Sequence, residues 1–523
     1  MTLKTTRRHL QLTKRSLKKF CSGPNLAGFV KDSCYLQSML DHYDIKTCQE
    51  AVRTKDARFD GKFFSAVKTT GIYCRTICPA TPLLKNIEFF QTTIAAELNG
   101  YRPCLRCRPE AAPGSDSWSG KSSLVQRAIK KISNNSLGNF VDEEFAAQFN
   151  ISARHLRRIF HAEMGITPKQ LIDSERLNFS RKLLCETSLA ITEIVGMAGF
   201  SSTRRFNDAF KKRFQRSPLQ FRKLYVRKSN YSAASIKMKL AFRPPLDWER
   251  TLEFFRFHTI KGVQNVQNSC FERVFTISHK VIAMRVSRAS HREIGVEVFG
   301  ECRAHLQIIL SRVKQMFDLD ADLQKINRAF DKNKALKTLL AKRPGLRLIG
   351  HWDFYESCIC TILGQLVSVT QANKLIAELV KAYGTKVIHP IDGSEALLFP
   401  NPETIARAGL SELATSEKRK NTLCALAMAI HLKELPADGE MENSLLRERL
   451  LAIPGIGPWT VDYVFLRALG NTNSFPHTDL ALKKALIKYP SLKGAKYSPW
   501  KAYIAVHLWA DYAANLNKRN GKK

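Results

Sequence analysis

Apolar residues recur at the 3.6-residue period of an amphipathic helix in the first half of this chain. The pattern predicts one helix pair at residues 142–149 and 152–160 and a second pair at 191–198 and 201–214. A longer helical segment at 167–185 joins the two pairs. Two short helix pairs around one long helix indicate an all-α unit.

The second half of the chain begins with a different pattern of apolar and polar residues. Residues 229–340 mix alternating apolar segments, such as Val-Ile-Ala-Met-Arg-Val at 281–286, with a helix expected at 304–316. Alternation with a period of two is typical of strands, so this stretch is predicted to be α+β. From about Arg347 onward the pattern is helix after helix. No run of 18 or more apolar residues occurs, so the sequence predicts no membrane span.

The length and the breaks in pattern indicate several domains. At 523 residues the chain is too long for one hydrophobic core, and roughly three to four domains are expected. Residues 113–117, Pro-Gly-Ser-Asp-Ser, are typical of a linker because proline and glycine break regular structure. Residues 1–40 are expected to form a basic, disordered arm that touches phosphates, although a transit peptide is the alternative.

Charge narrows the class of partner. The chain carries 83 Lys and Arg against 46 Asp and Glu, a net charge of +37 that is spread along its whole length. This spread favours a nucleic acid over a membrane surface as the anionic partner. The 13 cysteines are an odd number and too few for a disulfide scaffold, which indicates a reducing compartment such as the cytoplasm.

Four of the cysteines have the spacing of a metal site. Cys74 and Cys78 form one close pair, and Cys104 and Cys107 form a second pair 25 residues later. Two short-spaced pairs can close a tetrahedral four-thiolate zinc site. The alternative is a set of unrelated buried cysteines.

The segment Leu-Ala-Ile-Pro-Gly-Ile-Gly-Pro-Trp-Thr-Val at 451–461 predicts a helix, a tight hairpin and a second helix. Gly455 and Gly457 allow a tight turn and close backbone approach, and Pro458 fits the first turn of a helix. The exposed N–H groups of such a helix start can bind a phosphate. An ordinary helix–turn–helix corner is the alternative, but the strongly basic composition favours a phosphate polymer as partner.

This segment, followed by Asp479, resembles the helix–hairpin–helix, Gly/Pro, Asp signature of DNA base-excision glycosylases. The run Gly-Gln-Leu-Val-Ser-Val at 364–369 and the segments 499–500 and 507–509 further resemble the 3-methyladenine DNA glycosylase II, or AlkA, branch. Relatives that also nick the strand carry a lysine at the position of Trp459, so the resemblance implies a monofunctional enzyme. It covers the C-terminal half of the chain.

The AlkA resemblance implies a role for several residues. Asp479 would stabilise the positive charge that develops on the deoxyribose, although it could instead only cap the helix that follows it. Leu366, expected on the helix with Gly364 and Gln365, would fill the gap left by a flipped base; a buried leucine is the alternative. An aromatic pocket of Trp459, Tyr463 and Trp509 would hold the alkylated base. Trp459 and Tyr463 are four residues apart, an ordinary spacing for core residues, so packing alone is the alternative for these two.

The cysteine module resembles the methylphosphotriester-repair domain of the Ada family. The resemblance implies that Cys74 is both zinc ligand and methyl acceptor, in a single irreversible turnover. Losing one negative charge on methylation would weaken repulsion from DNA. The family usually has a basic residue three positions after the second cysteine, where this chain has Thr81. The departure bears on methyl transfer and not on the metal.

The two helix pairs resemble the AraC-type DNA-binding domain. Two recognition helices on a rigid linker can enter successive major grooves about one turn apart. Val195 stands where a small alanine is usual and could alter packing in the second pair. Four residues off the apolar faces are candidates for base or phosphate contacts: Arg154, Arg157, Thr203 and Arg204.

The sequence therefore predicts a multidomain, mainly α chain for DNA-alkylation repair and response. It would bind damaged and promoter double-stranded DNA, and RNA polymerase, as a cytoplasmic, nucleoid-associated monomer with one zinc. The rival interpretation is a transcriptional activator whose glycosylase half only anchors it on DNA. The expected domains are a zinc α+β module at 41–112, an AraC-type all-α domain at 113–228, an AlkA-type α+β domain at 229–345 and an all-α helix–hairpin–helix glycosylase domain at 346–523.

Overall fold

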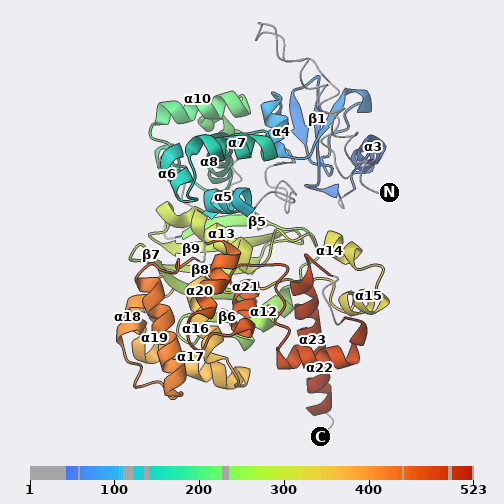
Figure 1. Ribbon diagram of the computed structural model, residues 1–523. Coiled ribbons are helices and arrows are strands. Elements are labelled where there is room, and N and C mark those ends of the chain that lie inside the picture. Colours follow the sequence, from blue (N-terminus) through green and yellow to red (C-terminus); the bar gives the residue numbers. More distant parts are fainter. Residues whose placement is uncertain are drawn as a thin grey trace, which may run out of the picture.

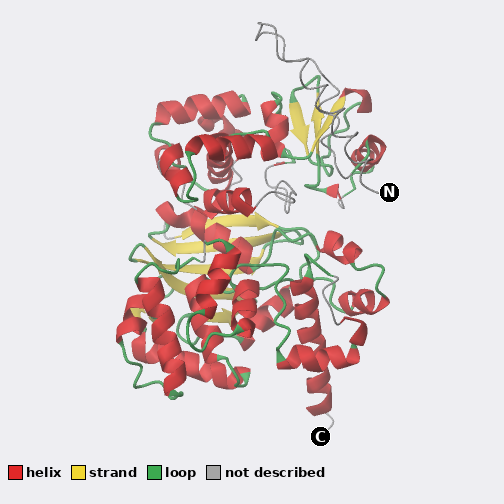
Figure 2. Ribbon diagram, in the orientation of Figure 1, coloured by secondary structure: helices red, strands yellow, loops and turns green. Residues whose placement is uncertain are grey.

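A computed structural model of the chain describes residues 43–56, 59–104, 106–107, 109, 123–134, 140–225, 235–438, 441–492 and 497–520 (Figure 1). The predicted basic arm and the predicted linker at 113–117 lie outside these residues. The described part has an upper portion, built from residues up to 225, and a lower portion built from the rest. Figure 2 shows that the largest sheet lies at the top of the lower portion, below the helices of the upper one.

The N-terminal module, residues 43–109, is built on a four-stranded sheet in the order β3-β1-β2-β4. β1 pairs antiparallel with β2 and β3, whereas β2 and β4 are parallel. Two small aromatic clusters form its core, one of them around Phe64 and Tyr73. Its elements are α3 (Ile45–Arg53), β1 (Phe64–Val67), β2 (Ile72–Cys74), η3 (Leu84–Asn86), β3 (Ile87–Phe90), α4 (Thr93–Leu98) and β4 (Arg102–Pro103).

The helical unit, residues 123–225, contains both predicted helix pairs and the long helix between them. The long helix begins with a capping box, in which the Thr167 hydroxyl accepts from Gln170 N and the Gln170 side chain accepts from Thr167 N. Val195 is buried in the core of the second pair. The helices are α5 (Ser123–Asn134), α6 (Asp142–Ala147), α7 (Ala153–Met164), α8 (Pro168–Glu186), α9 (Ile191–Met197), α10 (Thr203–Phe214) and α11 (Pro218–Tyr225).

The sheet domain, residues 235–316, is the α+β segment that the sequence predicts. Its five strands are antiparallel in the order β5-β9-β8-β7-β6, and the predicted strand at 281–286 lies within β8. The predicted helix at 304–316 begins with a short 3-10 turn. The elements are β5 (Ser235–Ala241), α12 (Trp248–Phe257), β6 (Gln264–Gln267), β7 (Cys270–Ile277), β8 (Lys280–Arg288), β9 (Glu293–Gly300), η5 (Arg303–His305) and α13 (Leu306–Met316).

In the C-terminal half, residues 317–520, the described regular elements are helices apart from one β-hairpin. The hairpin, β10 (Thr385–Ile388) with β11 (Glu395–Leu398), interrupts the predicted succession of helices and packs on β7 through Leu398 and Val274. The helices are α14 (Leu323–Ala329), α15 (Lys334–Ala341), α16 (Phe354–Leu363), α17 (Val369–Tyr383), α18 (Pro402–Arg407), α19 (Glu417–His431), α20 (Asn443–Leu451), α21 (Pro458–Arg467), α22 (Leu480–Lys488), η6 (Pro490–Leu492) and α23 (Lys501–Asn520).

Two separate hydrophobic cores organise the C-terminal half. One core joins α16, α17, α19, α20 and most of the buried side of α21. The other joins α14, α15, α22 and α23, and Leu466 of α21 contributes to it. Helix α21 therefore lies between the two cores. Among the described residues, every helix is too short or too polar to cross a lipid bilayer.

A third core is shared between the helical unit and the sheet domain. It includes Val125 of α5 and Phe317 after α13, and it extends to Ile94 of α4 and to Trp352 before α16. Polar contacts reinforce it: the Glu186 carboxylate accepts from Lys239 N at 2.9 Å, and Arg303 pairs with Glu193 at 3.0 Å. The helical unit and the sheet domain thus pack as one body.

Candidate functional site

The four cysteines with metal-site spacing meet at one end of the N-terminal sheet. The parallel pairing of β2 with β4 places Tyr73 beside Pro103, so Cys74 at the end of β2 lies near Cys104, which directly follows β4. Cys78 and Cys107 follow in the turns after those strands, and all four Sγ atoms lie within 4.8 Å of one another. Cys74, Cys78 and Cys104 are buried and Cys107 is partly exposed.

The sulfur positions fit zinc. A tetrahedral ion with Zn–S distances of about 2.3 Å separates its sulfurs by about 3.8 Å. Cys78 Sγ and Cys104 Sγ lie 3.9 Å apart. The four-cysteine zinc site that the spacing predicts is therefore built into the fold. Thr81, the residue that departs from the Ada pattern, lies three positions after Cys78 and is exposed.

The hairpin between α20 and α21 depends on one glycine. Gly455 has φ +92°, and a Cβ atom there would lie 2.1 Å from Thr422 Oγ1. Thr422 Oγ1 in turn donates to Pro454 O at 2.8 Å, which fixes the hairpin on α19. Gly457 meets open space instead and caps α21 without a side-chain bond, so the cap residue satisfies none of the first N–H groups of that helix.

A short turn between α16 and α17 approaches the same hairpin. Gln365 Nε2 donates to Gly455 O at 3.0 Å and to Thr460 Oγ1 at 2.9 Å. Leu366, next in the chain, has φ +58° and is fully exposed. The sequence placed Leu366 on a helix; α16 instead ends at Leu363, and the left-handed conformation at Leu366 is rare for leucine. The alternative of a buried leucine is wrong.

The Asp479 carboxylate accepts three hydrogen bonds, one each from residues of α21, α22 and α23. Its Oδ1 accepts from Leu482 N at 2.9 Å, so the residue does cap α22. Oδ1 also accepts from Trp509 Nε1 at 2.9 Å, and Oδ2 accepts from Trp459 Nε1 at 3.0 Å. Three donors hold both oxygens, yet the side chain is partly exposed. The carboxylate is therefore fixed in place but open to a ligand.

The three predicted pocket residues lie together beside Asp479. Trp459 stacks on Tyr463 with ring centroids 5.4 Å apart, and Tyr463 meets Trp509 at 5.7 Å. All three rings are partly exposed. Partly exposed rings, two of which donate their indole N–H groups to one carboxylate, differ from ordinary core packing. An aromatic surface of this kind attracts an electron-poor or cationic base.

Arg467 packs against the rings of Tyr463 and Trp509, and no sequence pattern described above predicts it. Its guanidinium carbon lies 5.6 Å from the Tyr463 ring, 5.3 Å from the Trp509 ring and 4.6 Å from the Phe254 ring. Nη1 donates to Ile349 O at 2.7 Å. The available signal was an arginine inside the apolar run Val-Phe-Leu-Arg-Ala-Leu at 464–469, because a buried charge requires partners.

Two histidines near Arg467 are uncharged at neutral pH. Burial lowers the pKa of His258 to about 4 and, together with Arg467, that of His351 to about 3. His258 stacks on Phe254 with centroids 4.2 Å apart, and His351 Nδ1 lies 2.8 Å from Ser357 Oγ. The cation behind the pocket therefore comes from Arg467 and not from these imidazoles.

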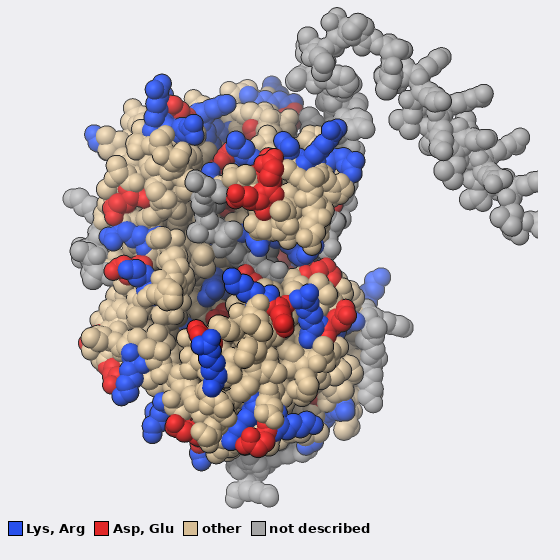
Figure 3. Space-filling view, turned by 60° about the vertical axis from the view of Figure 1, so that its left-hand side comes forward, with Lys and Arg blue, Asp and Glu red and all other residues tan. Residues whose placement is uncertain are grey.

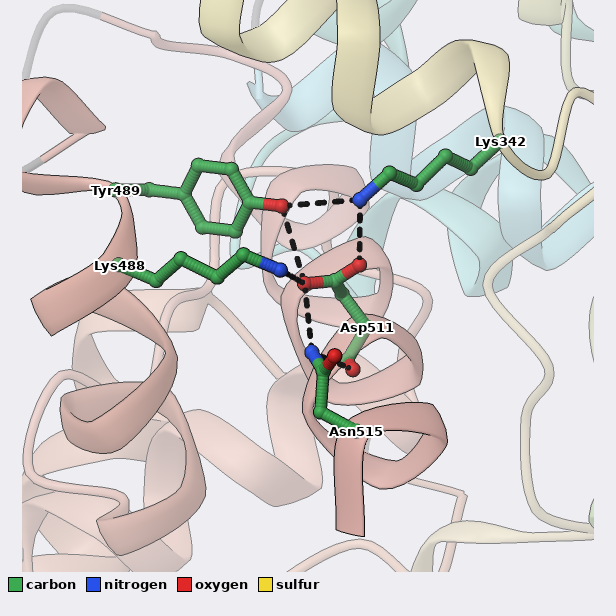
Figure 4. Close-up of polar contacts among 5 residues, drawn as sticks. All are labelled: Lys342, Lys488, Tyr489, Asp511 and Asn515. Atoms are coloured by element: carbon green, nitrogen blue, oxygen red, sulfur yellow. Dashed lines mark hydrogen bonds and ion pairs between the residues drawn. The ribbon is translucent and has the colours of Figure 1, made fainter. Parts of the chain in front are cut away.

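A second carboxylate locks the helices that carry Asp479 and Trp509 (Figure 4). Asp511 on α23 accepts from Lys342 at 2.8 Å, from Lys488 at 3.1 Å and from Tyr489 at 3.0 Å. Asn515 adds a further bond at 3.2 Å. Burial opposes ionisation here, but these donors outweigh it and hold the pKa of Asp511 well below its usual range. The network joins α15, the end of α22 and α23.

The four candidate DNA-contact residues of the helical unit all lie on its surface. Arg154 and Arg157 are exposed on α7, and Thr203 and Arg204 are exposed in the first turn of α10. Arg157 is 3.8 Å from Asp142, an exposed pair of little energetic weight. All four side chains are accessible to a nucleic acid, and their roles remain predictions.

Comparison with known proteins gives matches along most of the chain. The model described as the metal binding domain of Ada matches residues 47–110, a helix-turn-helix domain model matches 145–224, and the AlkA N-terminal domain model matches 237–353. A probable bifunctional transcriptional activator/DNA repair enzyme AlkA from Mycobacterium tuberculosis is 31% identical over 489 residues, covering 91% of this chain and 98% of the relative.

Two further matches each cover about half of this chain. DNA-3-methyladenine glycosylase 2 of Escherichia coli is 29% identical over 283 residues, which is 52% of this chain and 95% of that protein. The structure of a 3-methyladenine DNA-glycosylase from Archaeoglobus fulgidus aligns with a TM-score of 0.47 and 23% identity over 53% of this chain and 98% of that one.

Replacing Asp511 with asparagine tests the helix lock. Asp511→Asn removes the charge that holds two lysines, so the free energy of unfolding should fall by about 1–3 kcal/mol at pH 7. A depressed folded pKa contributes stability above the ordinary carboxyl pKa of about 4. The difference between parent and variant should therefore shrink as the pH falls below 4 in urea-unfolding measurements.

The matched control for this prediction is Asp331→Asn. Asp331 forms an exposed ion pair with Lys337 at 3.8 Å. The control substitution should change the free energy of unfolding by less than about 0.5 kcal/mol. Equal effects of the two substitutions at every pH would show that Asp511 does not lock the helices.

Proposed function

This chain belongs to the family of AlkA-type bifunctional transcriptional activator/DNA repair enzymes, and on that premise we propose that Asp479 is the carboxylate with which it excises alkylated bases. Its substrate class is double-stranded DNA with bases of the 3-methyladenine type. The products are the free base and an abasic site, without strand cleavage. The observation that carries the proposal is the fixed, partly exposed Asp479 carboxylate beside the partly exposed rings of Trp459, Tyr463 and Trp509.

The chemistry asks for a negative charge beside the sugar. When the bond between C1′ and the base nitrogen breaks, the electron pair leaves with the base and positive charge develops on the deoxyribose. The Asp479 carboxylate stabilises this charge, and water then adds to C1′ and loses a proton. A base that already carries positive charge leaves readily. Three hydrogen bonds hold the carboxylate before the reaction, so little reorganisation is needed.

The pocket and the wedge accommodate the flipped base. An alkylated purine would lie against Trp459, Tyr463 and Trp509, where attraction to ring faces contributes about 0.5–2 kcal/mol. Extruding a base costs a few kcal/mol, and the exposed Leu366 side chain is available to fill the gap. The link from Gln365 to Gly455 O supports a coupled arrangement of wedge and hairpin. The hairpin N–H groups would hold the backbone beside the lesion.

The N-terminal module supplies a second chemistry on the same polymer. Cys74, Cys78, Cys104 and Cys107 would hold one zinc ion, which keeps the sulfurs deprotonated at neutral pH. We infer that Cys74 Sγ attacks the methyl carbon of a phosphotriester: an S–C bond forms, the O–C bond breaks and the phosphodiester anion leaves. The thioether is stable, so each molecule acts once.

The helical unit gives the chain its regulatory role. We infer that Arg154 and Arg157 on α7 and Thr203 and Arg204 on α10 contact promoter DNA from successive major grooves. Lys and Arg side chains lie on both portions of the face drawn in Figure 3, among Asp and Glu. Binding of RNA polymerase at a promoter, action as a monomer and a location on the nucleoid are parts of the same proposal.

Asp479→Asn tests the glycosylase assignment. The substitution keeps the size and much of the capping capacity of the side chain while removing its charge. Release of 3-methyladenine from methylated duplex should fall by roughly two orders of magnitude or more. DNA affinity should survive because it depends on phosphate contacts, and stability should change by only about 1 kcal/mol. A folded variant that excises at the parent rate would contradict the role of Asp479. It would favour the rival interpretation, in which the C-terminal half only anchors the chain on DNA.

Mass spectrometry tests the methyl transfer. After incubation of the zinc-loaded chain with DNA that carries methylphosphotriesters, Cys74 should gain one methyl group and no more. Cys270→Ser, a change at a partly exposed cysteine of the sheet domain, should leave the adduct unaffected. An unmodified Cys74 in protein that retains its zinc would make the module a structural fold, with Thr81 as the first residue to examine.

A further inference from the structure

A buried ionic cluster joins the N-terminal module to the C-terminal half. Lys62 Nζ lies 3.2 Å from Asp322 Oδ2, and Arg243 Nη1 lies 2.7 Å from the same oxygen. The exposed fractions of the three side chains are 1%, 8% and 8%. Arg243 also donates to the Asp60 carbonyl. Two cations and one anion removed from water are costly unless the pairing is complete.

The members of this cluster come from three parts of the chain. Asp60 and Lys62 lie in the loop before β1 of the N-terminal module, and Arg243 follows β5 of the sheet domain. Asp322 caps α14 of the C-terminal half through Lys325 N at 3.1 Å. If the module separated, Arg243 would still pair with Asp322, but Lys62 would lose its partner. The ionic cluster is therefore complete only when the N-terminal module is docked on the C-terminal half.

The same loop is fastened to the four cysteines. Arg75 follows Cys74 directly, and its Nε donates to Asp60 Oδ1 at 2.7 Å. Arg75 N also lies 3.4 Å from Cys107 Sγ, and its Nη1 donates to Cys107 O at 3.3 Å. One arginine thus touches both the thiolate site and the loop that docks on the C-terminal half. A change in charge or geometry at the cysteines acts on that loop.

On the other side, the cluster is fastened to the helix of the base pocket. Arg347 donates to the carbonyls of Arg243 and Asp318, and Asp318 Oδ2 accepts from Tyr503 OH at 2.9 Å. Tyr503 is on α23, the helix that also carries Trp509, whose indole holds Asp479. Continuous hydrogen bonds and ion pairs therefore run from the thiolate site to the helix of the pocket.

We propose that the Lys62–Asp322–Arg243 cluster is an interface through which the thiolate site and the base pocket affect each other. Methylation or metal loss at the cysteines shifts the loop between its docked and undocked states and changes how α23 presents the pocket. By thermodynamic reciprocity, if zinc at the cysteines changes the affinity of the pocket for a ligand by a given factor, that ligand changes the affinity of the cysteines for zinc by the same factor. The partner of the N-terminal module is thus the C-terminal half of its own chain, in addition to DNA.

The experiment measures the zinc affinity of the full chain by equilibrium competition with a chromogenic chelator. The chain is bound either to a duplex with a tetrahydrofuran abasic site or to the undamaged duplex of the same sequence. Both duplexes contact the phosphate-binding surfaces, but only the first offers an abasic site to the pocket. In the parent chain the zinc dissociation constants should differ by about fivefold or more between the two duplexes. In Asp322→Asn, which retains the helix cap, the ratio should fall to near one.

The control is Asp331→Asn, at the end of α14 and exposed, which should keep the parent ratio. If Asp322→Asn does not fold, Lys62→Met replaces it, because that change leaves the Arg243–Asp322 pair intact. Equal zinc affinities with the two duplexes in the parent chain would overturn the proposal, and so would a parent-like ratio in the folded variant. Zinc content and 3-methyladenine release, measured in parallel, report on the proposed function separately.

Discussion

The arrangement of the C-terminal half depends on how one carboxylate is held. Asp479 has two oxygens and three donors, namely one backbone N–H and two indole N–H groups. The capping interpretation and the catalytic interpretation are therefore compatible. The bond from Leu482 N fixes the side chain at the start of α22, and the two indole N–H groups hold it beside the aromatic rings. The two rings come from helices α21 and α23, which belong to different hydrophobic cores. Packing errors in either core would move a donor away from the carboxylate.

Buried arginines hold the parts of this protein in register. Arg347 donates to the backbone carbonyls of Arg243, Pro245, Asp318 and Ala321. Arg273 pairs with Glu356, and Arg467 packs against the rings of Tyr463 and Trp509. A guanidinium can make several directed bonds from one site, which suits junctions between elements that share no strand or helix. Each such charge is costly if a partner is removed, so each junction is specific as well as stable. Part of the net charge of +37 is thus structural, and the remainder is available to DNA.

Local spacing predicted the features that depend on local geometry. The cysteine pairs, the two helix pairs, the hairpin at Gly455 and the cap at Asp479 each arise within a few residues, and sequence could find them. The β10–β11 hairpin escaped because its short strands lie among strong helical patterns. Leu366 was placed on a helix because its left-handed turn is set by distant partners, including Arg419, which donates to Gln365 O at 2.6 Å. Arg467 and the Lys62–Asp322 contact are long-range pairings that no local period encodes.

The central claim is that the Asp479 charge is directed at a sugar cation, and binding of an analogue measures this without any chemical step. A pyrrolidine abasic analogue is protonated near neutral pH and places a positive charge in the sugar ring, whereas tetrahydrofuran has the same shape without the charge. The parent chain should bind the pyrrolidine duplex at least about 100-fold more tightly than the tetrahydrofuran duplex. Asp479→Asn should bind both about equally. Equal affinity of the parent chain for the two duplexes, or an undiminished preference in the variant, would contradict the account.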